Sequence, residues 1–196
     1  QKSFHKFAGM ASDAVVANGD DPHTVQALEG IPYVSFGLGE SNRVRAENIS
    51  DDWRHFDVLC DGKFYCHMDL GVLGRHNTMN ALAVAATSWV MGIPGQKVTD
   101  GVKAFHGAGR RMEYKGEYRG AKVYDDYAHH PDELRATLEA VRGMGDHRIV
   151  LAFQPHTYTR TKLLMDDFIR ELQKADVVVL AEIYAARESN TIGISS

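Results

Sequence analysis

The chain has 196 residues, of which 44% are hydrophobic and 24% are charged, and its formal net charge is −4. These values are typical of ordinary globular proteins, and they exclude a disordered tail, a collagen-like fibre and a coiled coil. A chain of this length forms one full domain or two short ones.

Composition also excludes several partners. No basic stripe is present, so we expect no nucleic-acid partner, and no apolar run reaches the roughly 18 residues that a membrane helix needs. Residues 1–7 do not resemble a secretory signal. The two cysteines, Cys60 and Cys66, fit neither a disulfide framework nor a four-ligand zinc site. We therefore expect a reduced, cytoplasmic protein without membrane contact.

Two common nucleotide-binding loops are absent from the sequence. Neither a G-x-x-x-x-G-K-[ST] phosphate loop nor a G-x-G-x-x-G loop occurs. Taken alone, this absence argues against nucleotide binding.

The N-terminal part of the chain predicts a strand followed by a helix. Residues 14–18 are typical of a short buried strand. Asp20, Asp21 and Pro22 then predict a helix that runs to about Leu28, with an aspartate as its cap and proline in its first turn.

Three β-rich segments follow this helix. Residues 33–37 and 44–49 predict two further strands. Within residues 56–70, the pair Asp61-Gly62 separates two β-rich runs, which is a strong signal for a two-residue hairpin.

Residues 75–91 predict a helix that ends at Gly92. Its body is almost entirely small or apolar, so we expect it to be buried on most sides. The first turn is polar instead, and Asn77 and Asn80, three residues apart, share one face. Their amides suit the edge of a nucleobase, and they suit N-terminal capping equally well. A second helix is predicted at residues 95–105.

The glycine-containing segment 106–111 predicts a boundary between two domains, residues 1–108 and residues 109–196. Its arginines, Arg110 and Arg111, are compatible with a phosphate clamp and with a solvated charge pair.

The C-terminal part begins with a predicted hairpin of residues 113–118 and 121–126. From there the chain alternates between strands and helices, which predicts a parallel sheet with right-handed crossovers and an α/β fold class. The predicted strands are residues 122–126, 148–153 and 177–181, and the predicted helices are residues 131–142 and 161–174.

Three polar segments follow the ends of these strands, where parallel sheets bind their ligands. They are residues 125–131, 154–160 and 182–188. The N-termini of the two helices add partial positive charge to the same edge. We therefore predict an anionic ligand there, bound by residues that include His129, His156 and Arg160.

Simpler explanations exist for several of these residues. His129 and His130 could serve simply as helix-capping groups, and Tyr127 could serve simply as a core residue. Asp125 and Asp126 point in opposite directions if they lie on a strand, so at most one faces a ligand. No histidine pair at i,i+4 and no C-x-x-C motif supports a metal site.

With these residues in view, the sequence resembles the Mur ligases. Two shorter segments, N-G-D-D-P at 18–22 and I-Y-A-A-R-E at 183–188, agree with the resemblance, which extends over essentially the whole chain. The principal motifs are G-R-H-N-x-x-N-A-L-A at 74–83, F-x-G-x-x-R-R-x-E at 105–113, D-Y-A-H-H-P-x-E at 126–133 and F-Q-P-H-x-Y-x-R-T at 153–161.

The resemblance implies a fold in which a central ATPase domain is followed by a Rossmann-like C-terminal domain with a parallel sheet. Residues 1–108 resemble the later half of the ATP-binding domain, and residues 109–196 resemble the first part of the C-terminal domain. In the family, the phosphate loop and the main magnesium ligands precede the segment that resembles residue 1 of this chain. We therefore expect a fragment that lacks the N-terminal part of the same enzyme and is inactive alone.

The resemblance also implies an activity, ATP-dependent amide formation. A substrate carboxylate takes the γ-phosphoryl group of ATP, an amine attacks the acyl phosphate, and phosphate leaves. The motifs are most similar to those of family members that join L-alanine to UDP-N-acetylmuramate in peptidoglycan synthesis. ATP and Mg²⁺ are the implied cofactors, and UDP-N-acetylmuramate and L-alanine are the implied substrates.

Nucleotide-binding residues follow from the same resemblance. His76, Asn77 and Asn80 resemble contacts to adenine and ribose. Arg111 resembles the arginine that reaches the ATP phosphates across the domain cleft, and Asp126 resembles an aspartate close to the nucleotide. Arg111 and Asp126 are therefore also expected catalytic residues.

Substrate-binding residues are implied at the strand ends. Tyr127, His129, His156 and Arg160 resemble residues near the muramate and the incoming amino acid, and His129 is the third expected catalytic residue. Many relatives carry arginine where this chain has Thr157, which removes one cation from the edge.

Two alternatives to this activity remain open. A related ligase attaches a whole peptide to UDP-N-acetylmuramate during cell-wall recycling, although the F-Q-P-H-x-Y-x-R-T motif fits the alanine-adding enzyme better. A non-catalytic module that binds an anionic sugar or nucleotide is the other alternative.

Overall fold

The computed structural model describes all 196 residues, which divide into two compact units, Gln1–His106 and Gly107–Ser196. The division lies in the glycine-containing segment 106–111. None of the helices combines the length and the apolar character that a bilayer-spanning segment requires.

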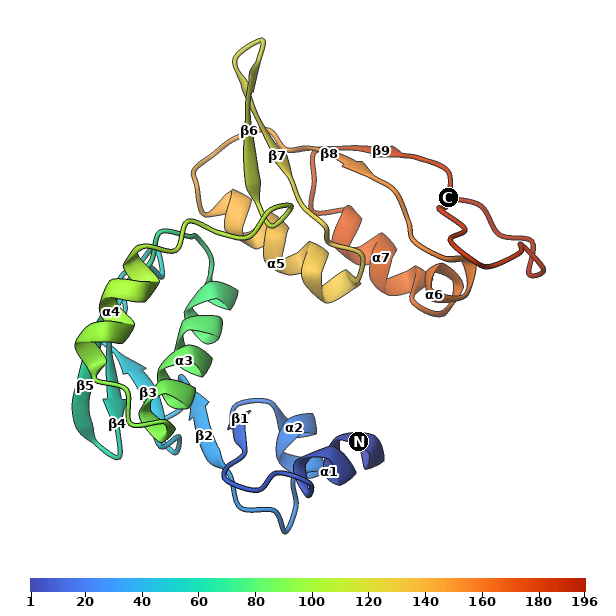
Figure 1. Cartoon of the computed structure of the whole chain (residues 1–196). Helices are drawn as coiled ribbons and strands as arrows, with labels where there is room; N and C mark the ends of the chain where they lie inside the picture. The colour runs from blue at the N-terminus through green and yellow to red at the C-terminus, as the bar shows by residue number, and fades with distance from the viewer. The chain divides into compact units, whose positions relative to one another are not determined.

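Unit 1, residues 1–106, contains one five-stranded sheet whose strands are neighbours in chain order (Figure 1). The first three strands pair in parallel, and the last three pair antiparallel. The strands are β1 (Val16–Asn18), β2 (Val34–Gly37), β3 (Val44–Glu47), β4 (His55–Cys60) and β5 (Lys63–Asp69). The predicted strands of this part are confirmed.

The β4–β5 hairpin turns at Asp61 and Gly62, as predicted. Both residues have positive φ, 45° and 76°, which a two-residue turn of type I′ requires. The Arg43 guanidinium binds the Asp61 carboxylate at 2.7 Å and so joins the turn to the preceding segment of the chain.

Asp20 closes the loop between β2 and β3. Its carboxylate accepts hydrogen bonds from the Leu38 backbone N–H and, at 2.6 Å, from the Asn42 side-chain amide. A β-carbon at Gly37 would lie 2.5 Å from this carboxylate, so only glycine fits there. The N-G-D-D-P motif therefore serves in part to stabilise the loop between β2 and β3.

Four helices accompany the sheet of unit 1. The Asp21 carboxylate caps the second of them by accepting hydrogen bonds from the His23 and Thr24 N–H groups, as the sequence predicted. Gly92, at φ 71°, follows the end of the third. The helices are α1 (Lys2–Ala8), α2 (Pro22–Ala27), α3 (Arg75–Val90) and α4 (Gly95–Lys103).

The prediction that the helix at 75–91 is buried on most sides is wrong. One face of α3, with Leu82 and Ala85, is fully buried, but Val84 on the opposite face is 48% exposed. Alanine and threonine occupy both faces, so the sequence shows almost no contrast between them. The helix lies against the sheet on a single face.

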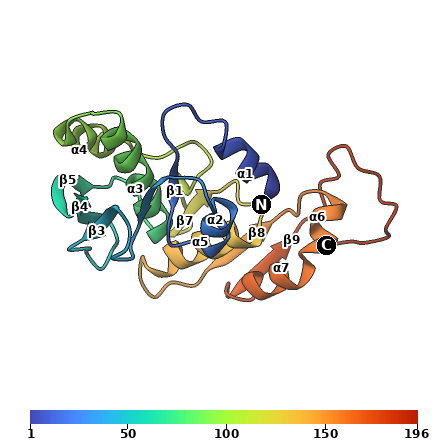
Figure 2. The same cartoon turned by 90° about the horizontal axis from the view of Figure 1, so that it is seen from below.

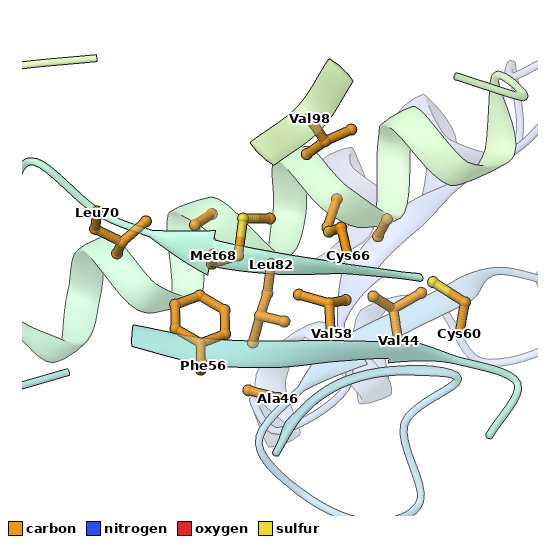
Figure 3. Packing of buried hydrophobic residues seen from close by; sticks show 13 residues of the cluster. Val44, Ala46, Phe56, Val58, Cys60, Cys66, Met68, Leu70, Leu82 and Val98 are labelled. Carbon is orange, nitrogen blue, oxygen red and sulfur yellow. The ribbon is translucent and has the colours of Figure 1, made fainter. Parts of the chain in front are cut away.

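The core of unit 1 lies between the sheet and helices α3 and α4 (Figures 1 and 3). Phe56, Val58 and Met68 of the hairpin are fully buried, and Leu82 of α3 packs among them. A buried polar group is satisfied as well, because the Thr78 hydroxyl donates to the Trp53 carbonyl at 2.8 Å.

Unit 2, residues 107–196, contains a hairpin and a parallel pair of strands. Figures 1 and 2 show α5 and α7 beside the parallel pair. Phe153 of this pair packs on Phe168 of α7, with 5.6 Å between the ring centroids. The elements are β6 (Glu113–Tyr118), β7 (Ala121–Asp125), α5 (Pro131–Arg142), β8 (Val150–Phe153), α6 (Tyr158–Leu163), α7 (Met165–Leu172) and β9 (Val177–Leu180).

Two details of unit 2 differ from the prediction. The strand predicted at 122–126 does not join the parallel sheet, because β7 pairs only with its hairpin partner β6, and β8 pairs with β9 alone. The helix predicted at 161–174 begins at Tyr158 and is interrupted at Leu164, which leaves the helical region at φ −112° and ψ 21°. The α/β class with parallel strands is confirmed.

Replacing Phe56 by alanine removes a fully buried ring, so we expect the free energy of unfolding of unit 1 to fall by about 3–5 kcal/mol. Both tryptophans, Trp53 and Trp89, lie in this unit. Their fluorescence in a urea titration therefore reports on it.

The matched control is Phe64→Ala on the neighbouring strand, because the Phe64 side chain is 67% exposed. We expect this change to stay within about 0.5 kcal/mol. Equal losses in the two variants would contradict the described core.

The hairpin also predicts a pH dependence. Hydrogen bonds from the His67 ring at 2.8 Å and the Asn48 amide at 2.7 Å hold the pKa of Asp57 below its ordinary value. Because the pKa in the folded state is lower than in the unfolded state, these contacts stabilise the protein above pH ~4 and less at lower pH.

Asp57→Asn should therefore lower stability near neutral pH by about 0.2–1 kcal/mol, the range of exposed pairs. The difference from the unchanged protein should shrink as the pH falls through the folded pKa of Asp57. Urea titrations at several pH values measure it, and a constant difference would show that the ionised carboxylate is not the cause.

Candidate functional site

The three predicted strand-end segments of unit 2 meet in a row of four rings. The Tyr127 and His129 centroids are 5.1 Å apart, those of His129 and His156 are 6.2 Å apart, and those of His156 and Tyr184 are 5.3 Å apart. Each segment contributes at least one ring. The row therefore brings together the predicted residues Tyr127, His129 and His156.

Backbone pairing beyond the ends of β8 and β9 places two of these rings. The Tyr184 N–H donates to the Pro155 carbonyl, and the Thr157 N–H donates to the Tyr184 carbonyl, both at 2.8 Å. His156 and Tyr184 thus form an isolated parallel bridge. Because they face each other across this bridge, their side chains lie on the same side.

Arg110 extends the row at its other end. Its guanidinium lies 4.8 Å from the centre of the Tyr127 ring and 3.6 Å from the Asp125 carboxylate. No role was predicted for Tyr184, whereas Arg110 was expected to belong to a phosphate clamp or to a solvated charge pair. The signal for Tyr184 was its position, since it follows the end of β9 as His156 follows the end of β8.

Asp126 connects the start of unit 2 to the ring row. Its carboxylate accepts hydrogen bonds from the Met112 N–H at 2.9 Å and from the Ala128 N–H at 2.8 Å. The Tyr127 N–H donates to the Arg110 carbonyl at 2.7 Å. Both oxygens of Asp126 are thus bound to backbone groups, which fix the segment that carries the two arginines.

Glu133 joins Arg111 to His129. Its carboxylate lies 3.3 Å from the Arg111 guanidinium and accepts the His129 backbone N–H at 2.9 Å. Burial raises the pKa of Glu133, but the His129 N–H and the Arg111 charge outweigh it, so the pKa lies below its ordinary value. Glu133 ends the D-Y-A-H-H-P-x-E motif, but no role was predicted for it, although an acidic residue in a first helical turn is a common capping signal.

Two buried polar atoms of the second segment have no partner within the protein. They are Nδ1 of His156 and Nη1 of Arg160. Such atoms are rare in folded proteins because burying one without a partner costs about 1–3 kcal/mol. Both atoms belong to the segment that carries His156, so a ligand or a water molecule bound at this edge would supply the missing partners.

The helix N-termini contribute less positive charge than predicted. Glu188 accepts the Thr159 N–H at 2.9 Å and is hydrogen-bonded to the Thr159 hydroxyl. The Thr159 hydroxyl and N–H hold the pKa of Glu188 below its ordinary value. The start of α6 is therefore already occupied by a carboxylate. At α5, the His130 ring accepts the Asp132 N–H at 3.3 Å.

The backbone at this edge is strained at two residues. Thr157 has φ 69° and Ala186 has φ 53°. The left-handed region is unfavourable for residues other than glycine, and most of all for β-branched ones such as threonine. The two strained residues flank the bridge between His156 and Tyr184.

In unit 1, the predicted residues His76, Asn77 and Asn80 lie in the first turns of α3. The Asn77 amide donates to the Leu73 carbonyl at 2.8 Å, and the Asn80 amide donates to the Asn77 side-chain oxygen at 3.3 Å. The two asparagines share one face, as predicted. Asn77 makes a local contact at the helix start, while Asn80 is exposed to solvent.

Neither metal ligation nor a deep hollow marks these residues. No group of three or more His, Cys, Asp or Glu side chains is placed to hold a metal ion. A surface hollow of about 590 Å³ is lined by residues of the segment 25–33 and contains none of the predicted site residues.

Two family descriptions match the chain, one in each unit. The Mur ligase middle domain matches residues 3–88, and the Mur ligase, glutamate ligase domain matches residues 110–192. The first turns of α3 and the three strand-end segments lie within these matched ranges.

Individual relatives agree with these matches. A UDP-N-acetylmuramate–L-alanine ligase of Caldanaerobacter subterraneus is 41% identical over 203 residues, which cover 100% of this chain and 44% of that protein. The crystal structure of a UDP-N-acetylmuramate–alanine ligase from Thermotoga maritima has a TM-score of 0.74 and 31% identity, and covers 93% of this chain and 40% of that chain.

A murein peptide ligase from Psychrobacter arcticus has a TM-score of 0.68 and 26% identity, over 90% of this chain and 39% of that chain. The chain therefore spans less than half the length of each of these relatives. Since both units match successive domains of one family and the identity extends through the whole sequence, the chain belongs to the Mur ligase family.

Proposed function

We propose that this chain is part of an ATP-dependent ligase that joins L-alanine to UDP-N-acetylmuramate in the cytoplasm. The observation that carries the proposal is the ring row of unit 2 with its two unpartnered polar atoms, His156 Nδ1 and Arg160 Nη1. The names of the relatives support the choice of substrates. The two free, buried cysteines, Cys60 and Cys66, are compatible with a reducing compartment.

The proposed reaction has two steps. A carboxylate oxygen of the muramate attacks the γ-phosphorus of ATP, and ADP leaves. The alanine nitrogen then attacks the carbonyl carbon of the acyl phosphate, phosphate leaves, and the nitrogen loses its proton to a base. Both steps develop negative charge on oxygen, so positioned cations and hydrogen-bond donors stabilise them.

His129 is the proposed base. Its Nδ1 lies 2.9 Å from the Tyr127 carbonyl oxygen, so this nitrogen carries the proton of the neutral ring. Nε2 then keeps its lone pair and can accept a proton from the alanine nitrogen. Glu133 holds the backbone of His129 and favours this orientation.

Arg111 is the proposed contact to the ATP phosphates. Its guanidinium is half exposed and 3.3 Å from Glu133, so the ion pair can open toward a stronger anion. Asp126 has a positioning role in this proposal, because its carboxylate already holds the Met112 and Ala128 N–H groups. It fixes the backbone on either side of the arginine and the ring row.

In unit 1, His76, Asn77 and Asn80 are the proposed contacts to adenine and ribose. The exposed Asn80 amide offers donor and acceptor groups that suit a nucleobase edge. Mg²⁺ is the proposed companion of ATP, and its main ligands are expected in the part of the full-length protein that precedes the residues of this chain. The ion would supply positive charge to the phosphoryl transfer.

A second candidate is a ligase that attaches a peptide to UDP-N-acetylmuramate. The similarity to the murein peptide ligase structure favours this candidate. The identity to that structure, 26%, is lower than the 31% identity to the alanine ligase structure. The two candidates differ only in the amine that attacks the acyl phosphate.

The full-length protein should release phosphate from ATP only when UDP-N-acetylmuramate and L-alanine are both present, and it should prefer L-alanine to a tripeptide that begins with alanine. A coupled phosphate assay with each amine in turn measures this preference. Preference for the tripeptide would select the second candidate. Ligand binding without turnover under any of these conditions would favour a non-catalytic module.

Arg160→Ala should raise the KM of one of the two carboxylate-bearing substrates roughly 10–100-fold, the effect expected for a lost charged hydrogen bond. Arg160→Lys keeps the charge and tests for loss of fold. The control is Arg170→Ala, whose guanidinium is 63% exposed on α7 and pairs with Asp167. Steady-state kinetics of the three variants measure these KM values. Unchanged KM values for Arg160→Ala would show that Arg160 does not bind a substrate.

A further inference from the structure

The charge at the strand-end edge of unit 2 is carried by side chains. Glu188 already occupies the N–H groups at the start of α6, and its negative charge interacts with Arg160. The charge of Glu188 offsets part of the charge of Arg160. A further cation at this edge would therefore strengthen the attraction for a bound carboxylate.

Arg187 is the cation that the segment after β9 supplies. It is exposed, and its side chain forms no hydrogen bond, ion pair or ring contact in the structure. Most other arginines of unit 2 are engaged with acidic groups. These are Arg110 with Asp125, Arg111 with Glu133, Arg135 with Asp132, Arg142 with Asp176 and Arg170 with Asp167.

The backbone holds Arg187 close to the second segment. Tyr184 is bound to Pro155 and Thr157 through two backbone hydrogen bonds, and Glu188 is bound to Thr159. Arg187 therefore lies between two anchors on the same five-residue stretch. The strained residue Ala186, at φ 53°, directly precedes it and sets the direction of the chain at that point.

We propose that Arg187 is a further substrate-binding residue, which holds a substrate carboxylate together with Arg160. This inference rests on the proposed ligase function. Arg187 is not among the predicted site residues. The charges of Arg160, Arg187 and Glu188 together sum to about +1. A guanidinium can grip a carboxylate through two parallel hydrogen bonds.

Two carboxylates could be the bound group, that of L-alanine and that of the muramate. Kinetics of the full-length protein distinguish them. Arg187→Ala should raise the KM of one of these substrates about tenfold or more and leave kcat and the KM of ATP within about twofold. The substrate whose KM rises identifies the carboxylate.

Two variants refine the assignment. Arg187→Lys should restore only part of the affinity, because an ammonium group cannot form the paired hydrogen bonds of a guanidinium. Arg119→Ala is the matched control, because Arg119 lies at the tip of the β6–β7 hairpin and contacts only the Tyr118 ring. We expect the kinetics of the Arg119→Ala variant to match those of the unchanged protein.

A footprinting experiment tests the contact without catalysis. Phenylglyoxal modifies accessible arginines, and peptide mass spectrometry locates the modified residues in the full-length protein. UDP-N-acetylmuramate, alone and with L-alanine, should protect Arg187 at least threefold and leave Arg119 unprotected. Protection by the sugar nucleotide alone assigns the muramate carboxylate, and protection only in the ternary mixture assigns that of alanine.

The outcomes separate the two proposals. If the protein ligates alanine and Arg160 is protected, but Arg187 is neither protected nor needed for a low KM, the inference on Arg187 is wrong and the proposed function stands. If no alanine-dependent turnover occurs and neither arginine is protected, both are wrong.

Discussion

The candidate site of unit 2 depends on the parallel pairing of β8 and β9 and on its continuation past the ends of the strands. Two backbone hydrogen bonds at Tyr184 extend this pairing by one bridge. That bridge sets His156 beside Tyr184, and His129 joins from the segment that precedes α5. The bridge, together with the hydrogen bonds between Glu188 and Thr159, fixes the second and third segments relative to each other.

Around this bridge, most charged groups serve to position others. Asp126 and Glu133 hold backbone N–H groups of the segments that carry Arg111 and His129, and Glu188 holds the start of α6. Carboxylates in these roles cost little because each is hydrogen-bonded. The histidines and arginines are therefore available to bind a ligand, which agrees with the anionic substrates proposed for this family member.

Sequence patterns predicted the local features of the fold well. Turn chemistry at Asp61-Gly62, the Asp21 cap and the end of a helix at Gly92 all depend on residues close in the chain. Sheet membership was harder, since alternation of strands and helices cannot tell whether β7 pairs with β8 or only with its hairpin partner. For the site, position after a strand end indicated His129, His156 and Arg160, whereas the partner that each carboxylate chooses depends on the assembled fold.

The hydrogen bonds of Asp126 and Tyr127 have a mechanical consequence. They clamp residues 110–112 to the loop after β7, on the C-terminal side of Gly107 and Gly109. Arg110 and Arg111 would therefore move together with the loop after β7 in any rotation of the backbone at these glycines. The glycines and the two arginines are only a few residues apart, so a change of backbone torsion at either glycine would shift both guanidinium groups.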